Sequence, residues 1–230
     1  MVRTEQVLAD RSWSELAAHG PPIVLVPLGS TEQHGPHLPV STDALIAVAL
    51  AEAMAASRSD LLVAPCLSFG ASGEHQGFPG VLSLGTEVLA RVLIELARSA
   101  RSWSKGLCFV LAHGGNVSAV AQAVTVIEAE GDLVCVVTAS SPNADAHAGR
   151  AETSVLLAVA PSKVRQTEMV VGETRALGEI IEELTAGGVR SVSSTGVLGD
   201  PTGSTADEGH ERLSAMVAAG LRVLEGTFPQ

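Results

Sequence analysis

The chain has 230 residues, of which 46% are hydrophobic, and its 25 acidic residues outnumber its 14 basic ones. A net charge of −11 repels phosphate groups, so the composition argues against nucleic acid and anionic membranes as partners. No apolar run approaches the roughly 20 residues that span a bilayer, and the amino-terminal sequence lacks the apolar core of a signal peptide. We therefore expect one domain over residues 1–230, located in the cytoplasm.

Short apolar runs flanked by turn-forming residues predict four buried strands, at residues 22–29, 61–68, 106–113 and 132–140. Segments with Ala, Leu and Val at three- and four-residue spacing predict helices at 43–57, 86–102, 117–130, 151–160, 172–186 and 206–225. This alternation predicts an α/β fold in which helices cover both faces of a mostly parallel sheet.

The three cysteines, Cys66, Cys108 and Cys135, lie inside apolar runs, and none has a second cysteine at CxxC spacing. We interpret them as reduced core residues. This interpretation excludes disulfides and a thiolate zinc site.

Five of the seven histidines follow predicted strands, and the other two, His19 and His210, are expected at the surface. The five are His34, His37, His75, His113 and His147. The loops beyond the carboxyl ends of parallel strands line one crevice, so we expect these imidazoles to gather there with Glu32, Asp43 and Glu152. Imidazoles and carboxylates without sulfur suit Zn²⁺, Mn²⁺ or Fe²⁺. The sequence therefore predicts a metal site at this edge.

Five sequence blocks resemble the creatininase family of metal-dependent amidohydrolases, and they occur in the family's order. They are GSTEQHGPHLPVSTD (29–43), EHQGFPGVLSLG (74–85), HGGN (113–116), HAGRAETS (147–154) and GVLGDPTGSTADEG (196–209). The resemblance implies a three-layer α/β/α sandwich that assembles into a homo-oligomer, a hexamer or larger. It also implies hydrolysis of the C–N bond of an amide.

The resemblance further implies two divalent metal ions per chain, of zinc, iron or manganese. Glu32, Asp43 and His113 would hold one ion; His34, the bridging Asp43 and Glu152 would hold the other. His147 would transfer the proton between water and the leaving amine. Creatininase carries a glutamate where this chain has Gly115, so the ligand set of the second ion stays open.

Ser72, Glu74 and His75 are candidates for substrate binding, although Glu74 and His75 could equally form a salt link within their loop. We interpret His37 as a structural hydrogen-bonding residue rather than a ligand. The resemblance places tryptophans around the small ring that creatininase cleaves, whereas Trp13 and Trp103 lie far from His147 in this sequence. Creatinine is therefore the weaker substrate hypothesis.

Residues 70–89 and the lysine-poor composition look most similar to the family's mycofactocin-system peptidases. Those members release a C-terminal Val-Tyr dipeptide from a modified precursor peptide. A formamide hydrolase of flavin or deazaflavin synthesis is the alternative enzyme, and a metal-binding scaffold is the non-enzymatic one. A nucleotide-binding module is disfavoured because no G-x-G-x-x-G or G-K-[ST] motif is present.

The tract from Gly187 to Gly209 is rich in glycine, serine and threonine. Connections of this length are uncommon in compact domains unless they are functional or disordered. Because Asp200, Pro201 and Gly203 favour turns, we expect an ordered loop with little regular structure. We further expect it to become ordered at a subunit contact and to wall the substrate cleft.

Overall fold

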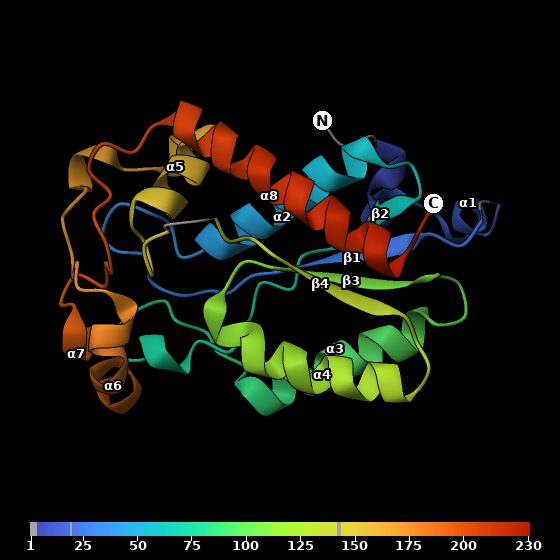
Figure 1. The fold of residues 1–230 in the computed structure, drawn as a ribbon, viewed down its shortest axis with the longest axis horizontal. Coiled ribbons are helices and arrows are strands. Elements are labelled where there is room, and N and C mark those ends of the chain that lie inside the picture. Colours follow the sequence, from blue (N-terminus) through green and yellow to red (C-terminus); the bar gives the residue numbers. More distant parts are fainter. Residues whose placement is uncertain (1–3, 19, 142–143) are drawn as a thin grey trace.

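A computed structural model describes residues 4–18, 20–141 and 144–230. Their core is a sheet of β1 (Ile23–Leu28), β2 (Leu61–Val63), β3 (Gly106–Leu111) and β4 (Val134–Thr138) (Figure 1). The helices are α1 (Trp13–Ala17), α2 (Thr42–Ser57), α3 (Thr86–Ala100), α4 (Val117–Ala129), α5 (Arg150–Val159), α6 (Leu177–Gly187), α7 (Val189–Val192) and α8 (Ala206–Thr227). Single 3₁₀ turns are η1 (Thr4–Gln6), η2 (Leu8–Asp10), η3 (Gly73–His75), η4 (Gly114–Asn116), η5 (Pro161–Lys163) and η6 (Gln166–Glu168).

The sheet has the order β2-β1-β3-β4, and each neighbouring pair is parallel. The chain leaves β1 towards β2 on one side and returns to β3 on the other. The strand order therefore reverses between β1 and β3. In open α/β sheets, a ligand crevice forms at such a point, outside the carboxyl ends of the strands.

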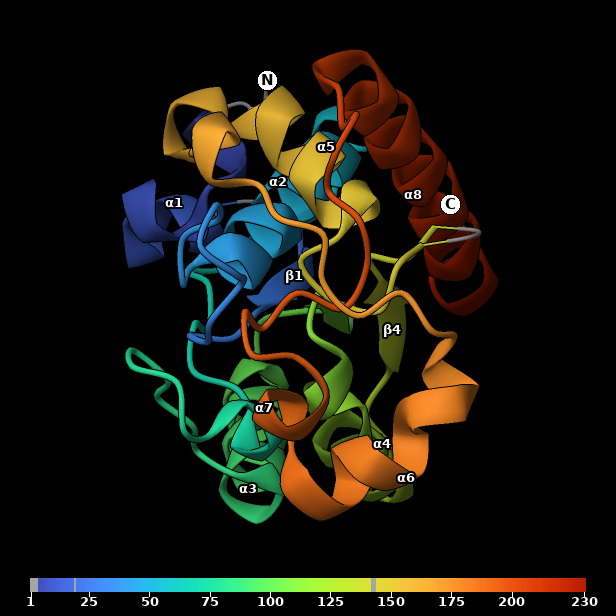
Figure 2. The same cartoon turned by 90° about the vertical axis from the view of Figure 1, so that its left-hand side faces the viewer.

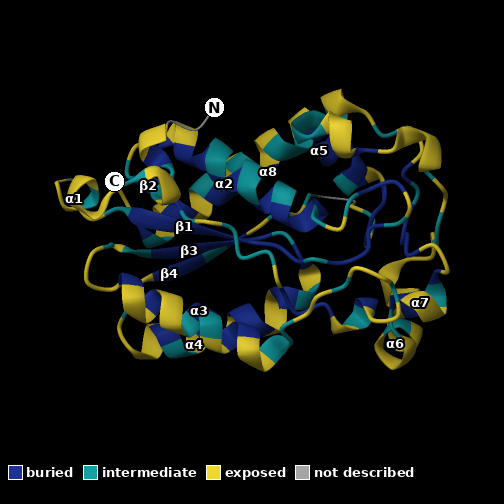
Figure 3. Cartoon of the chain, turned by 180° about the vertical axis from the view of Figure 1, so that it is seen from behind, coloured by how far each residue is buried: buried dark blue, intermediate teal, exposed yellow. Residues whose placement is uncertain are grey.

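Side chains of the central strands alternate between two hydrophobic cores. Ile23 and Leu25 of β1 point into the core under α2, α5 and α8, whereas Val24 and Val26 point into the core under α3 and α4. Figure 3 shows buried strands between helices whose outer sides are exposed. Because both faces of the sheet are buried, the strands are apolar except at Thr138, the exposed last residue of β4. The predicted three-layer arrangement is confirmed.

The second strand is shorter than predicted. It ends at Val63, although residues 64–68 continue beside β1 through hydrogen bonds from the N–H of Ala64 to the carbonyl of Leu25 (2.8 Å) and from Leu67 to Pro27 (3.0 Å). The two donors are three residues apart instead of two, so one extra residue in the segment 65–66 interrupts the regular ladder. The predicted helix at 172–186 is also shorter, because α6 begins only at Leu177.

Two α-helices of the structure were not predicted, the short helices α1 and α7. A capping box begins α1, since Glu15 N–H donates to Ser12 Oγ (3.4 Å) and Ser12 N–H donates to the Glu15 carboxylate (2.7 Å). The S-x-x-E sequence could have revealed this helix. Within the tract 187–209, residues 193–205 have no helix or strand, as predicted, whereas residues 206–209 belong to α8.

The three cysteines are free thiols. Cys108 and Cys135 are buried and face one another across β3 and β4, as expected for core residues. Cys66 is only half-buried. No helix among the described residues combines the length and apolarity needed to cross a membrane.

Candidate metal and catalytic site

The predicted histidines and carboxylates gather beyond the carboxyl ends of the strands, at the end of the molecule that faces the viewer in Figure 2. Glu32 and His34 follow β1, and His113 follows β3. The other members are Asp43 in the first turn of α2, His75 on η3, His147 after β4 and Glu152 in the first turn of α5. All but Glu152 are buried, because the helices close over this edge.

Glu32 lies at the centre of the cluster and is fully buried. Its Oε1 is 3.1 Å from His75 Nε2 and 3.7 Å from His147 Nδ1, while its Oε2 is 3.2 Å from His113 Nε2. One carboxylate thus faces imidazoles from three different loops.

Asp43 joins the two halves of the cluster. Its Oδ1 is 3.1 Å from His34 Nε2, and its Oδ2 is 3.5 Å from His113 Nδ1. Glu152 Oε2 lies 3.9 Å from the same nitrogen of His34 and accepts a hydrogen bond from the Ala148 N–H (2.7 Å). This geometry suits Asp43 to bridge two cations, because one of its oxygens faces His34 and the other faces His113.

The carboxylates have the unsatisfied atoms that a cation would satisfy. Both oxygens of Glu32 and Oδ2 of Asp43 are buried without a hydrogen-bond partner among the described residues. Three groups place ligand atoms within 4.8 Å of one another; they are Glu32–Asp43–His113, His34–Asp43–Glu152 and Glu32–His34–His147. The first two are the sets that the resemblance implies. The residues present therefore fit divalent cations.

The pKa values of the cluster show how strongly its charges interact. Burial raises the pKa of the Glu32 carboxyl, but contact with His113 and the nearby imidazoles outweigh burial and hold it well below its usual range. Burial lowers the pKa of His34, but the Asp43 carboxylate outweighs burial and raises it to about 9. Without a bound cation, protons on the imidazoles thus offset the negative charges of the carboxylates. Bound cations would replace those protons.

His147 presents one nitrogen to the cluster. Its Nε2 is 2.7 Å from the backbone carbonyl oxygen of Gln33. Because a carbonyl only accepts, Nε2 carries the proton and Nδ1, which faces Glu32, has a free lone pair. Burial and the neighbouring His34 and His75 lower its pKa well below the ordinary value, so the ring is neutral. It is therefore suited either to accept a proton or to act as a third imidazole ligand.

Gln33 is a functional candidate that the sequence analysis missed. Its side-chain nitrogen donates to His75 Nδ1 (3.0 Å) and to the carbonyl of Gly196 (3.1 Å). The hydrogen bond to His75 Nδ1 leaves the proton of His75 on Nε2, which lies 3.1 Å from Glu32 Oε1. A Cβ at Gly196 would collide with the Gln33 amide, so only glycine permits this approach. Contacts within the chain thus order the 187–209 tract, and the subunit contact stays a prediction.

Gly115 does not leave room for a side chain. An added Cβ would collide with the backbone carbonyl of Ala71 and with the carboxylate of Glu74. Glu74 Oε1 occupies this space and lies 3.3 Å from His113 Nε2. The Glu74 carboxylate, which comes from a different loop, thus fills the space beside Gly115 and faces His113. A single sequence gives no signal for such an approach between distant loops.

The three predicted substrate-binding residues occupy different environments. Glu74 and His75 line a cleft of about 590 Å³ beside Asp43, His113, His147 and Glu152. Ser72 is fully buried, and its hydroxyl pairs with that of Ser30. Ser72 is not among the described residues that line the cleft, and its role in substrate binding stays a prediction.

The remaining histidines occupy positions outside the cluster. His37 Nε2 pairs with the Thr153 hydroxyl (3.0 Å), in accord with a structural role, and burial lowers its pKa to about 4. His210 is exposed, as expected, and His19 lies outside the described residues. Among the described residues that line the cleft there is no tryptophan or phenylalanine. The cleft thus lacks the aromatic walls expected around a small flat ring.

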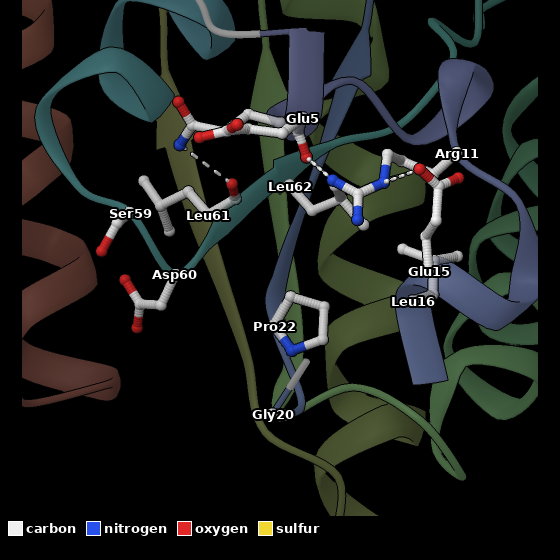
Figure 4. Close-up of a pocket in the computed structure, with 11 residues that line it drawn as sticks. Glu5, Arg11, Glu15, Leu16, Gly20, Pro22, Ser59, Asp60, Leu61 and Leu62 are labelled. Atoms are coloured by element: carbon white, nitrogen blue, oxygen red, sulfur yellow. Dashed lines mark hydrogen bonds and ion pairs between the residues drawn. The ribbon is translucent and has the colours of Figure 1, made fainter. Parts of the chain in front are cut away.

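A second cavity, of about 660 Å³, lies at the amino ends of the strands and includes Pro22, Leu61 and Leu62 (Figure 4). Arg11 lies across it, where Nη1 donates to the Glu5 carbonyl (3.0 Å) and Nε faces the Glu15 carboxylate at 3.9 Å. No histidine is among the described residues that line it. The cavity has carboxylates, from Glu5, Glu15 and Asp60, but none of the imidazoles gathered at the other end.

The sequence pattern of the creatinine amidohydrolase family matches residues 9–224. The mycofactocin precursor peptide peptidase of Mycolicibacterium smegmatis is 50% identical over 201 residues, which cover 85% of this chain and 81% of that protein. The Mycobacterium tuberculosis protein of the same name is 44% identical over 232 residues, covering 97% and 92%. A creatininase crystal structure superposes with a TM-score of 0.80 over 98% of both chains at 22% identity, which supports the fold.

Proposed function

This chain belongs to the creatininase family of amide hydrolases, and we propose that it is a metal-dependent peptidase acting on the mycofactocin precursor peptide. The bond cleaved is the amide before a C-terminal Val-Tyr dipeptide. The observation that carries the proposal is the similarity, along most of the chain, to peptidases with that substrate. The volume of the cleft and its lack of a phenylalanine or tryptophan wall fit a peptide better than creatinine.

The chain's candidate metal ligands are Glu32, Asp43 and His113 for one ion, and His34, Asp43 and Glu152 for the other. Zinc, iron and manganese all suit imidazole and carboxylate ligands. Two such cations, when bound, would lower the pKa of a water molecule between them and supply a nucleophile near neutral pH.

The protein's own contribution to hydrolysis centres on His147. Its free Nδ1 accepts a proton from the attacking water and returns it to the leaving amine as the C–N bond breaks. The Gln33 carbonyl holds the ring in this tautomer, since it binds the opposite nitrogen. Burial of the cluster excludes bulk water and strengthens each electrostatic interaction with the substrate carbonyl.

The test is cleavage of the modified precursor peptide by protein loaded separately with Zn²⁺, Fe²⁺ or Mn²⁺, followed by mass spectrometry. We expect release of the C-terminal dipeptide, and loss of that release after chelation of the metal. Creatinine and a formamide are assayed in parallel. Turnover of either one without peptide cleavage would overturn the proposed substrate, whereas the assignment as an amide hydrolase would stand.

We further propose that the chain acts as a homo-oligomer, a hexamer or larger, within the cytoplasm. Large apolar side chains on the isolated chain, such as Trp13 at 82% exposure and Leu82 at 57%, are candidates for burial between subunits. Light scattering on the purified protein gives the subunit number. A monomer at micromolar concentration would contradict the assembly, and cell fractionation tests the location.

A further inference from the structure

One side of the cleft is apolar and comes from a single helix. Leu177, Ile181 and Leu184 of α6 line the same cleft as the candidate metal ligands Asp43, His113 and Glu152. Their spacing of four and three residues places them on one face of the helix. Leu177 is 47% exposed and Ile181 is 43% exposed, so this face is only partly covered by the chain itself. We call these three residues the α6 wall.

The α6 wall is held at a fixed position by a small hydrophobic core of its own. Ile180 on α6, Val189 on α7 and Leu198 are buried together, and Phe78 packs against them. Arg190 of α7 donates to the Gly77 carbonyl, and its guanidinium lies 5.4 Å from the centre of the Phe78 ring.

These contacts couple the wall to the loop that carries Glu74 and His75. α6 and α7 both contact η3, which contains those two residues, and Figure 2 shows α6 and α7 at the end of the sheet that holds the site. Leu198 also exchanges backbone hydrogen bonds with His147 (2.8 and 3.2 Å). Packing contacts therefore fix the distance between the α6 wall and the catalytic groups.

The charges of the cleft select the type of group that the wall can receive. No lysine or arginine is among the described residues that line the cleft, whereas Asp43, Glu74 and Glu152 do line it. A neutral apolar group that covers Leu177 and Ile181 is stabilised by burial of apolar surface, whereas an acidic side chain there has no cation to pair with.

We propose that the α6 wall determines specificity by receiving the large apolar or aromatic side chain of the departing C-terminal residue. This inference rests on the proposed peptidase function. Binding of that side chain would hold the preceding amide bond over His147 and the metal ligands. The wall contacts the substrate without taking part in bond cleavage, so it affects substrate affinity more than turnover.

The test compares two synthetic peptides that differ only in their last residue, Val-Tyr and Val-Ala, on zinc-loaded protein. Dissociation constants come from calorimetry, and KM and kcat from release of the dipeptide. The variants are Leu177→Ser and Ile181→Ser. Leu96→Ser is the matched control, because Leu96 is 40% exposed on α3 and does not line the cleft.

We expect each wall variant to weaken binding of the Val-Tyr peptide and raise its KM by about tenfold, with kcat within about twofold of the original. The Val-Ala peptide should change by less than about twofold, as should both peptides with the Leu96→Ser protein. Equal losses for both peptides, or no preference in the unchanged protein, would overturn the wall as a specificity determinant.

Two further outcomes separate this inference from the proposals on which it stands. If the unchanged protein binds Val-Tyr in preference to Val-Ala but cleaves neither, the peptidase function fails while the wall stands. If Leu177→Ser or Ile181→Ser dissociates an oligomer and weakens both peptides equally, the face is a subunit contact and the wall is overturned.

Discussion

The two ends of the sheet both bury polar side chains, but among the described residues only one end gathers buried carboxylate oxygens without a hydrogen-bond partner. At the amino end, the Gln6 amide donates to three backbone carbonyls at 2.6, 3.1 and 3.2 Å. Arg58, also buried, makes two hydrogen bonds to Asp60 (2.7 and 3.1 Å) and one to the Phe228 carbonyl (2.7 Å). This network joins η1, α2 and the carboxyl-terminal residues, and its bonds are complete within the chain.

At the carboxyl end, Glu32 and Asp43 are buried as deeply, yet three of their four oxygens lack a hydrogen-bond partner among the described residues. Leaving a buried charged group unsatisfied costs several kcal/mol unless something else binds it. The comparison shows that burial alone does not distinguish a functional site from a structural one. Unsatisfied ligand atoms that converge do distinguish it, and the predictions below test this difference.

The largest effect is expected for His147→Ala. Loss of a positioned acid–base group lowers kcat by about 10² to 10⁴. Because His147 stands outside the two proposed ligand sets, the metal content should stay unchanged. Peptide kinetics and elemental analysis measure the two quantities on one sample. Loss of metal together with activity would make His147 a ligand, as the Glu32–His34–His147 group allows.

A smaller loss is expected for Gly115→Ala. The new Cβ collides with the Ala71 carbonyl and with Glu74, so His113 must shift. A displacement of about 1 Å at a catalytic site lowers the rate by roughly 10²-fold. Gly114→Ala is the matched control, because nothing lies within 4 Å of a Cβ there. Equal activities of the two variants would show that the space at Gly115 is not required.

At the amino end, Arg58→Ala should affect stability rather than activity. Loss of its charged hydrogen bonds lowers the free energy of unfolding by about 2 kcal/mol or more. Metal content and kcat at low temperature should match those of the unchanged protein. Arg98→Ala, which breaks an exposed ion-pair cluster with Glu95 and Glu130, should hardly change the unfolding curve. A large drop in activity for Arg58→Ala would remove the distinction between the two ends.

The elements that carry the site were predictable because their signals are local. β1 and β3 are apolar on both faces, and Glu32, His34 and His113 follow them directly. Parallel pairing then brings those side chains together without further information. The strand order was not predicted, because no periodicity records which strand lies beside which.

The parts that sequence reasoning missed depend on contacts between distant segments. Gln33 bonds to Gly196, 163 residues further along the chain, and Glu74 fills the space beside Gly115. The hydrogen bond between the Ser72 and Ser30 hydroxyls was missed for the same reason, because the two residues lie 42 positions apart in the sequence. The α6 wall was hidden, since its apolar spacing is that of any amphipathic helix.

The central claim is that the carboxyl end holds divalent cations through a bridging Asp43. The decisive measurement is the metal content per chain after equilibrium dialysis against Zn²⁺, for the unchanged protein, Asp43→Ala and Asp60→Ala. We predict two ions for the unchanged protein, two for Asp60→Ala, whose carboxylate belongs to the amino-end network, and none for Asp43→Ala. Two ions retained by a folded Asp43→Ala protein would contradict the account.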